Sequence, residues 1–211
     1  MPVGGRMRVT LAQMEISTEA GPARIALDAP RTASFLLVMT HGAAGGVDTR
    51  DLLAVRDVAV SMNAAVARVL QPYRVRGARA PGSPDRQDAA WLEIVGGLRR
   101  KYPGVPLVQG GRSNGARVAC RTAAAAGARA VVALAFPLHP PGHPERTRVD
   151  ELRAAGTDVL VVNGERDPFG IPDDRDAARV IVLPAETHAL TRDPAAVGAA
   201  VGSWLSELFG G

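Results

Sequence analysis

Residues 108–119 read Val-Gln-Gly-Gly-Arg-Ser-Asn-Gly-Ala-Arg-Val-Ala and contain the spacing Gly111-x-Ser113-x-Gly115. An apolar stretch precedes this spacing and an alanine-rich stretch follows it, so the sequence predicts a strand, a tight turn at Ser113 and a helix. Glycine at the two flanking positions lets neighbouring backbone approach closely. The Ser113 hydroxyl would then project above the strand end, beside the N–H groups that begin the helix.

Strand-like and helix-like stretches alternate along the whole chain. The predicted strands are Val9–Ile16, Ala23–Ala29, Ser34–Thr40, Ala65–Leu70, Pro106–Gly110, Ala130–Ala135, Val159–Val162 and Arg179–Leu183. The predicted helices are about Arg50–Met62, Asp88–Lys101, the stretch after Ser113 up to about Ala126, Arg148–Ala155 and Pro194–Phe209. A hairpin is expected across Glu19–Pro22, and Gln71–Gln87, rich in proline and glycine, is expected to be an exposed strap. The alternation predicts an α/β fold with a mostly parallel, doubly wound sheet and helices on both faces.

The composition is that of an ordinary globular protein. The 211 residues are 46% hydrophobic and 22% charged, so we expect a single domain over residues 1–211. The 25 Lys and Arg residues exceed the 21 Asp and Glu residues by only four, and the arginines are scattered among the acids. This pattern argues against a nucleic-acid partner. Cys120 is the only cysteine and falls in a predicted helix, where it is expected to pack as a small apolar side chain.

No stretch of the sequence predicts an association with membranes. Met1–Gln13 lacks the continuous apolar core of a signal peptide. The longest apolar stretch, Ala130–Leu138, is too short to cross a bilayer. Because a single cysteine permits no intramolecular disulfide, we expect a cytoplasmic protein with no membrane partner.

Four loops with polar residues or glycine follow predicted strands: His41–Gly46, Gly111–Gly115, Gly164–Gly170 and Pro184–Leu190. In sheets of this kind, functional groups gather beyond the carboxyl ends of the strands. The four loops are therefore expected to meet at one edge of the sheet.

A base and a carboxylate are available in two of these loops. A serine hydroxyl is a weak nucleophile at neutral pH and needs a base, which His188 would supply. Asp167 would orient that imidazole and stabilise its charged form. The chain order Ser113, Asp167, His188 is the order found in α/β-hydrolases. Asp167 could instead cap a turn, which would leave Asp173 or Asp174 as the acid, and His188 could be an ordinary surface histidine.

An acyl-transfer site also needs donors for a developing oxyanion. The backbone N–H of Asn114, next to the candidate nucleophile, is one expected donor. The second is expected from the glycine-rich loop, at Ala43 or, as a close alternative, Ala44. His41 begins this loop and is expected to be structural, with its ring hydrogen-bonded to backbone.

Other polar residues carry weaker signals. His139 and His143 lie in a proline-rich loop, where His139 could contact a substrate. A metal site is not expected there, because no third ligand stands at a suitable spacing. Arg74, Arg76 and Arg79 in the strap are either solvated or placed to attract an anionic group of a substrate.

Residues Val108–Gly115 also resemble a glycine turn that binds dinucleotides. That turn belongs after the first strand of its domain and needs an acidic residue about 20 positions later. Here it lies in the middle of the chain, Arg117 replaces the last glycine, and Gly127–Val132 contains no acid. No cofactor is expected.

The sequence resembles the dienelactone-hydrolase-like branch of the α/β-hydrolase superfamily. It is most similar there to the group with the testis-expressed protein 30 and the hydrolase-like domain of a non-specific-lethal complex subunit. The likeness lies in Thr40–Gly45, Gly110–Arg117, Phe136–Pro140, the Gly164-x-x-Asp167 segment and the loop with His188. It implies an α/β-hydrolase fold without a cap domain. Two positions depart from the pattern, because dienelactone hydrolases use a cysteine nucleophile and Asn114 stands where methionine is usual.

The sequence thus predicts a serine hydrolase acting on an ester or thioester of a small-molecule acyl substrate, with no cofactor and no metal. Ser113, Asp167 and His188 would be catalytic, and Ala43 and Asn114 would hold the oxyanion. Two alternatives stay open. One is a non-catalytic binding or scaffold protein that keeps the fold. The other is an acyltransferase or biosynthetic thioesterase with the same three side chains.

Overall fold

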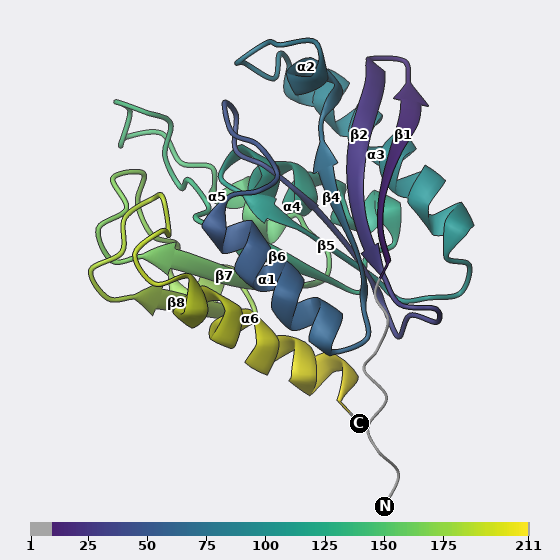
Figure 1. The fold of residues 1–211 in the computed structure, drawn as a ribbon. Coiled ribbons are helices and arrows are strands. Elements are labelled where there is room, and N and C mark those ends of the chain that lie inside the picture. Colours follow the sequence, from purple (N-terminus) through teal and green to yellow (C-terminus); the bar gives the residue numbers. More distant parts are fainter. Residues whose placement is uncertain (1–9, 211) are drawn as a thin grey trace, which may run out of the picture.

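The computed structural model describes residues 10–210, whose eight strands form one sheet (Figure 1). The order across the sheet is β1-β2-β4-β3-β5-β6-β7-β8. β2 runs antiparallel to both β1 and β4, and all other neighbouring strands are parallel. The strands are β1 (Thr10–Thr18), β2 (Gly21–Ala29), β3 (Leu36–Thr40), β4 (Ala65–Leu70), β5 (Leu107–Arg112), β6 (Ala130–Leu134), β7 (Asp158–Gly164) and β8 (Arg179–Leu183).

Helices cover both faces of the sheet. They are α1 (Arg50–Ser61), α2 (Pro72–Val75), α3 (Pro84–Lys101), α4 (Asn114–Ala126), α5 (Val149–Arg153) and α6 (Pro194–Phe209), with a short 3₁₀ turn η1 (Asp174–Asp176). α1 and α6 lie side by side on the face turned toward the viewer in Figure 1, and α3, α4 and α5 cover the other face. The predicted doubly wound α/β fold is confirmed.

Strand β3 lies in the centre of the sheet and contributes to the core on both faces. Leu37 and Met39 pack into the apolar cluster that contains α1 and α6 side chains. Leu36 and Val38 point the opposite way, into the cluster that contains α3 side chains, because successive strand residues alternate between faces. All five β3 residues are buried. The loop that leaves this strand is therefore anchored on a rigid support.

Most element ends lie close to the predicted ones. The hairpin across Glu19–Pro22 is confirmed, since Thr18 pairs with Gly21. β1 continues to Thr18, and Val9, the first residue of the predicted strand, lies outside the described residues. β5 continues past the predicted end at Gly110, through Gly111 to Arg112, and brings the strand directly to Ser113.

The prediction of an exposed strap over Gln71–Gln87 is confirmed in the middle of the segment, where residues 76–83 form no helix or strand and are mostly exposed, and is wrong at its two ends. Residues Pro72–Val75 form the short helix α2, and α3 begins at Pro84 rather than at Asp88. Proline suits the first helical position because its fixed φ is helical and its missing N–H would have no partner there. Gln71, Tyr73 and Gln87 are buried, and the two glutamine side chains are hydrogen-bonded to each other at 2.9 Å.

The loops with the candidate functional residues meet at the carboxyl edge of the sheet. In the register of the parallel pairs, Thr40 at the end of β3 lies beside Gly111, and Gly164 at the end of β7 lies beside Leu183. Within residues 10–210, the segment between β6 and β7 forms no cap domain and contains one short helix, α5. The expected fold without a cap agrees with this arrangement.

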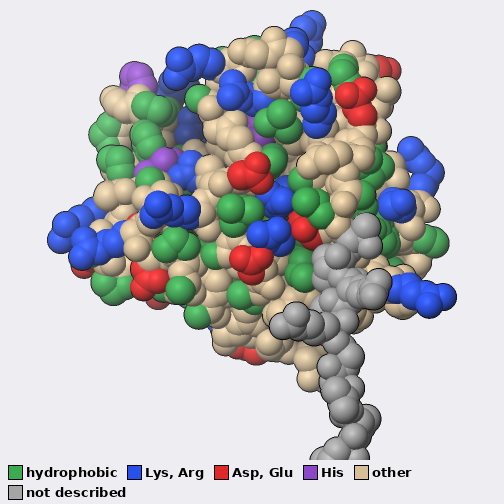
Figure 2. Space-filling model, in the orientation of Figure 1, with side chains coloured by type: hydrophobic (Ala, Val, Ile, Leu, Met, Phe, Trp, Pro, Cys, Tyr) green, Lys and Arg blue, Asp and Glu red, His purple; other side chains and the backbone are tan. Residues whose placement is uncertain are grey.

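Charged side chains of both signs are spread over the face shown in Figure 2. In the described part of the chain, no helix combines the length and the apolar character that crossing a bilayer would require.

Candidate active site

Ser113 occupies the turn between β5 and α4 in a strained backbone conformation. Its φ is 53° and its ψ is −115°, a combination that costs a non-glycine residue about 1–3 kcal/mol. Its N–H donates to the carbonyl oxygen of Leu134 on β6, 2.8 Å away. The hydroxyl therefore projects from the sheet edge on a turn that the neighbouring strand holds in place.

The two glycines that flank Ser113 are required by close backbone contacts. A Cβ on Gly111 would lie 2.6 Å from the carbonyl carbon of Gly115 and 2.8 Å from the oxygen of Thr40. A Cβ on Gly115 would lie 2.6 Å from the same Thr40 oxygen and 2.8 Å from the oxygen of His41. The expectation that glycine permits close passage of the backbone at this turn is met by these distances.

Ser113, His188 and Asp167 form one hydrogen-bonded line. His188 Nε2 lies 2.9 Å from Ser113 Oγ, and His188 Nδ1 lies 2.8 Å from Asp167 Oδ2. Because the ionised carboxylate can only accept, Nδ1 carries the proton and Nε2 is free to accept from the serine hydroxyl. The Asp167 side chain is fully buried, and its second oxygen accepts from the N–H of Phe169 at 2.9 Å.

The loop with His188 reaches Ser113 because the end of β7 makes room for it. A Cβ on Gly164 would lie only 2.5 Å from the carbonyl oxygen of Glu186. That oxygen accepts from the N–H of Arg166 at 2.8 Å. The ring of Phe169 meets the His188 ring edge-on, with 4.5 Å between their centroids. The loop with Asp167 and the loop with His188 are thus packed against each other.

One expected oxyanion donor, Asn114, directly follows Ser113, and the loop with the other, Ala43, passes next to the serine. A Cβ on Gly42 would be 3.4 Å from the Cβ of Ser113, so the loop after β3 passes next to the serine. Among residues 10–210, neither the N–H of Ala43 nor that of Asn114 is hydrogen-bonded to a protein acceptor. Two unpaired N–H groups at this edge are what a carbonyl oxygen of a substrate would need.

Helix α2 fixes the loop that bears Ala43. The Tyr73 hydroxyl donates to the carbonyl oxygen of Ala43 at 2.9 Å, and Arg74 Nε donates to that of Gly45 at 3.0 Å. Burial raises the pKa of Tyr73 to about 12, so the hydroxyl keeps its proton at ordinary pH. Nothing in the sequence around Tyr73 indicates this role, because only the fold brings α2 to this loop.

His41 braces the same loop from inside. Its Nδ1 lies 2.8 Å from the carbonyl oxygen of Gly42, and its Nε2 accepts from the N–H of Gln71 at 3.1 Å. Since a backbone N–H can only donate, Nε2 is unprotonated and Nδ1 carries the proton. Burial lowers the pKa of His41 to about 4, which keeps the ring neutral. The ring is thus placed as a structural support.

The alternative acids, Asp173 and Asp174, and the cysteine are not part of this hydrogen-bonded line. Asp173 is paired with exposed Arg175, and Asp174 begins η1. Neither is hydrogen-bonded to His188. Burial raises the pKa of the Cys120 thiol to about 12, so this cysteine is not a reactive thiolate.

The proline-rich loop is not part of the hydrogen-bonded line. The His139 ring packs against Gly170, where an added Cβ would lie 2.7 Å from its Cδ2. His143 pairs with Glu145 at the surface. Over residues 10–210, no three His, Cys, Asp or Glu side chains are grouped to hold a metal ion.

The arginines of the predicted strap are turned to other partners. Arg74 is hydrogen-bonded to backbone in the loop after β3 and at Ala78, Arg76 donates to the carbonyl oxygen of Ala20 at 3.0 Å, and Arg79 is exposed.

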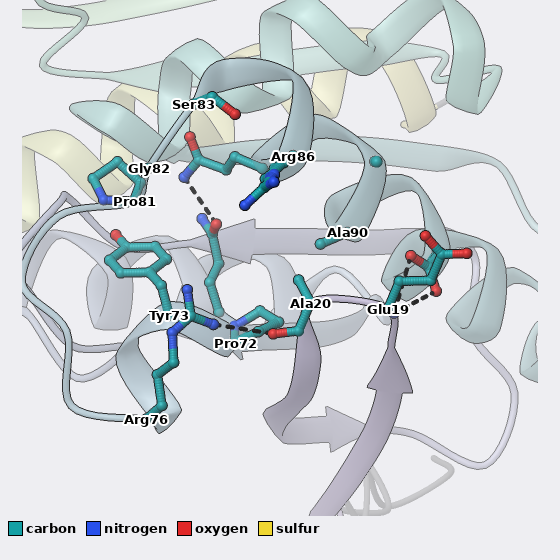
Figure 3. Close-up of a pocket in the computed structure, with 14 residues that line it drawn as sticks. Glu19, Ala20, Pro72, Tyr73, Arg76, Pro81, Gly82, Ser83, Arg86 and Ala90 are labelled. Atoms are coloured by element: carbon teal, nitrogen blue, oxygen red, sulfur yellow. Dashed lines mark hydrogen bonds between the residues drawn. The ribbon is translucent and has the colours of Figure 1, made fainter.

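Arg76 also lines a cavity of about 760 Å³ between α2, the start of α3 and the β1–β2 turn (Figure 3). Ser113 does not line this cavity, but Tyr73 does, so only one hydrogen bond separates its wall from the Ala43 loop.

Arg112 is a further residue of the site, and the sequence pattern assigns it no role although it directly precedes Ser113. Its Nη2 donates to the carbonyl oxygen of His188 at 2.6 Å. Its Nε donates to Asp51 Oδ2 at 2.9 Å. The variable position of Gly-x-Ser-x-Gly gives no signal by itself, because its partners come from distant parts of the chain.

Solved structures with the same fold are numerous. Est1E from Butyrivibrio proteoclasticus has a TM-score of 0.77 at 15% identity, covering 94% of this chain and 99% of its own. A serine hydrolase without a lid from Xanthomonas campestris has a TM-score of 0.71 at 16% identity, covering 100% and 99%. A dienelactone hydrolase from Anabaena variabilis has a TM-score of 0.69 at 17% identity, covering 95% and 97%. At such identities the likeness concerns the fold.

A search of curated proteins finds no match to the sequence. A family model, described as alpha/beta hydrolase domain, matches residues 33–190. This range contains Ser113, Asp167 and His188 together with both expected oxyanion donors. Because the match extends over most of the sequence, the chain belongs to the alpha/beta hydrolase domain family.

Proposed function

We propose that the protein is a serine hydrolase that cleaves a carboxylic ester or thioester through an acyl-enzyme on Ser113. The observation that carries the proposal is the continuous line from Ser113 Oγ to His188 Nε2 at 2.9 Å and from His188 Nδ1 to Asp167 at 2.8 Å. Such a line allows the imidazole to take the serine proton while the carboxylate stabilises the resulting positive charge.

The reaction follows from this geometry. Ser113 Oγ attacks the acyl carbon as its proton passes to His188 Nε2, and the carbonyl oxygen becomes an oxyanion beside the N–H groups of Ala43 and Asn114. The bond to the leaving group then breaks, and His188 returns the proton to the departing alkoxide or thiolate. Water, deprotonated by His188, attacks the acyl-enzyme in the same way and releases the acid. Asp167 stays ionised throughout, and no metal or cofactor takes part in this scheme.

The proposal includes a finer placement and a setting. We place the chain in the dienelactone-hydrolase-like branch, near the testis-expressed protein 30 group, on the strength of its Gly110–Arg117 motif. We also propose that it works in the cytoplasm, which suits its single, buried cysteine. Its partner would be a small acyl substrate rather than a nucleic acid or a membrane.

The first experiment is labelling with a fluorophosphonate probe, which reacts with activated serines. We expect the native protein to be labelled and Ser113→Ala to remain unlabelled. Ser203→Ala is the matched control, because Ser203 is exposed on α6, and it should label as the native protein does. Absence of labelling in the native protein would contradict the proposal and favour a non-catalytic protein that keeps the fold.

A panel of chromogenic esters, thioesters and lactones then defines the substrate. A structure of the similar protein Est1E contains ferulic acid, so the panel should include hydroxycinnamoyl esters. Because the described chain forms no cap over the site, we expect activity on several small acyl groups. Strong preference for one large substrate would contradict the open site. Acyl transfer to an added alcohol, in preference to water, would identify the acyltransferase alternative.

A further inference from the structure

The guanidinium of Arg112 contacts three parts of the candidate site at once. Nη2 donates to the carbonyl oxygen of His188 at 2.6 Å, and Nε donates to Asp51 Oδ2 at 2.9 Å. A Cβ on Gly42 would lie 3.2 Å from Nη1, which places the guanidinium against the loop after β3. The side chain is only 15% exposed. Arg112 is thus packed between α1, the loop with His188 and the loop with Ala43.

The ion pair of Arg112 and Asp51 joins β5 to α1, and both residues are rigidly held. Arg112 is the last residue of β5 and pairs with Leu134 of β6, so its backbone is fixed by the sheet. Asp51 lies in the first turn of α1 with its side chain fully buried, and its other carboxylate oxygen accepts from the N–H of Leu52 at 2.9 Å. A buried carboxylate that lost its cation would be strongly unfavourable, so the pair holds the guanidinium in one orientation.

A hydrogen bond to the backbone carbonyl of His188 also restrains the position of the imidazole of the same residue. The loop with His188 contains residues with positive φ at Ala185 and Leu190. Its other anchors include the N–H of Ala185, which donates to Glu165 Oε2 at 2.8 Å, the hydrogen bonds at Glu186 and the buried side chain of Leu190. Arg112 is the anchor at His188 itself. A charge-assisted hydrogen bond is about twice as strong as a neutral one, and the planar guanidinium also fixes direction.

We propose that Arg112 is a positioning residue that sets the distance between His188 Nε2 and Ser113 Oγ. The inference rests on the proposed function of Ser113 and His188. Arg112 precedes the nucleophile in the chain and holds the base, so one residue couples two groups that are 75 positions apart. Because proton transfer requires the two atoms within hydrogen-bond reach, a small displacement of His188 lowers the rate steeply.

Arg117 offers a matched control. It lies one helical turn after Ser113 and forms a two-point ion pair with Glu151, with Nε to Oε2 at 2.7 Å and Nη2 to Oε1 at 2.5 Å. Its side chain is 17% exposed, close to the value for Arg112. In contrast to Arg112, it is not hydrogen-bonded to His188, Asp167 or the Ala43 loop. Loss of either arginine removes a largely buried ion pair, but only the loss of Arg112 should affect His188.

The test compares Arg112→Gln, Arg112→Lys and Arg117→Gln by kcat, KM and the rate of fluorophosphonate labelling. We expect Arg112→Gln to lower kcat and the labelling rate about 10- to 100-fold, with KM within about twofold of the native value. Arg112→Lys keeps one donor and the charge and should recover part of the rate. Arg117→Gln should keep the native kcat even if its melting temperature falls as far.

Hydrogen exchange of the backbone amides of Ala185–Leu190 provides a readout that does not depend on activity. We expect faster exchange of this loop in Arg112→Gln than in the native protein or in Arg117→Gln. If the native protein is not labelled, the proposed function fails, and loop exchange still decides whether Arg112 holds His188. If the native protein and Arg112→Gln are labelled at equal rates, the inference about Arg112 is overturned alone.

Two further results would also overturn it. A rise in KM with unchanged kcat in Arg112→Gln would make Arg112 a substrate ligand instead. An equal loss of kcat in Arg117→Gln would attribute the effect to stability. Should Arg112→Gln fail to fold, Arg112→Lys carries the comparison, because it retains a cation opposite buried Asp51.

Discussion

The hydroxyl of Tyr73 donates a hydrogen bond to the carbonyl oxygen of Ala43, 2.9 Å away. The residue whose N–H we propose as an oxyanion donor is therefore anchored through its carbonyl group by a side chain of α2. The same tyrosine forms part of the wall of the large cavity in Figure 3. A change at this contact alters the donor without touching Ser113.

We predict that Tyr73→Phe lowers kcat about fivefold with little change in KM. The variant keeps the ring and loses one neutral hydrogen bond, which is worth about 1 kcal/mol, or about a factor of five in rate. Tyr102→Phe is the control, because the Tyr102 hydroxyl is hydrogen-bonded to no residue in the described range. Steady-state kinetics on one ester would decide, and equal rates for Tyr73→Phe and the native protein would contradict the role of the contact.

Gly164→Ala should displace the His188 loop. Its new Cβ would lie 2.5 Å from the Glu186 carbonyl oxygen, so the loop must move, at a cost of about 1–3 kcal/mol in stability. We expect slower labelling of Ser113 and a lower urea midpoint. Gly46→Ala is the control, since an added Cβ there meets nothing within 4 Å. If both variants label at the native rate, the close passage at Gly164 does not position the base.

Asp167→Asn should reduce kcat by about 10³- to 10⁴-fold with a modest change in KM. An amide cannot stabilise the charged imidazole and favours the wrong tautomer, as in serine proteases. Asp173→Asn, at an exposed carboxylate paired with Arg175, should keep the native kcat. A large loss in the Asp173 variant and none in the Asp167 variant would reverse the assignment of the acid.

The buried ring of His41 predicts a loss of stability in mild acid. Burial lowers its pKa from the ordinary histidine value of 6.5 to about 4, so the unfolded chain takes up a proton first as pH falls. The stability that the neutral ring provides is fully present above pH 6.5 and is lost as the pH falls from 6.5 to 4. By pH 5 the free energy of unfolding has fallen by about 2 kcal/mol from this cause. Urea unfolding at about pH 7.5 and about pH 5 would measure it. His41→Gln has no titrating ring, so its free energy of unfolding should fall less between the two pH values. A pH dependence equal to that of the native protein would contradict the role given to His41.

Asn114→Met should stabilise the protein by about 1 kcal/mol. The Asn114 side-chain nitrogen is buried without a hydrogen-bond partner among the described residues, and an unmet donor costs about 1–3 kcal/mol. The backbone N–H, which we propose as an oxyanion donor, is unchanged by the substitution. Thermal unfolding and kcat would be measured together. A tenfold fall in kcat would show that the side chain binds a polar group of the substrate.

The fold and the candidate triad could be predicted because local and global signals agree. The apolar run of β3, the alanine-rich α4 and the Gly111-x-Ser113-x-Gly115 spacing each indicate their own element, and the chain order of Ser113, Asp167 and His188 fits the sheet. The parallel topology brings strand ends to one edge. Contact between these residues needed no knowledge of side-chain packing.

The supports of the site could not be predicted in the same way. Arg112 contacts Asp51 and His188 only once α1 and the loop Pro184–Leu190 are folded. Tyr73 contacts Ala43 only once α2 has formed. The proline and glycine content around Tyr73 indicates irregular, exposed backbone. Burial of Gln71 and Gln87 in a polar network overrides that composition.

The segment between β6 and α5 gives no hydrogen bond to Ser113, Asp167 or His188 in the described chain. The segment is thereby separate from the hydrogen bonds that connect Ser113, His188 and Asp167. We expect insertions at residues 137–148 to add a cover near the acid loop Gly164–Gly170, against which His139 packs, and so to change which molecules reach the site. Such a lengthened loop would leave the acid in place only if it kept the hydrogen bond from the N–H of His139 to the carbonyl oxygen of Phe169, at 2.8 Å, because Phe169 lies in the loop with Asp167.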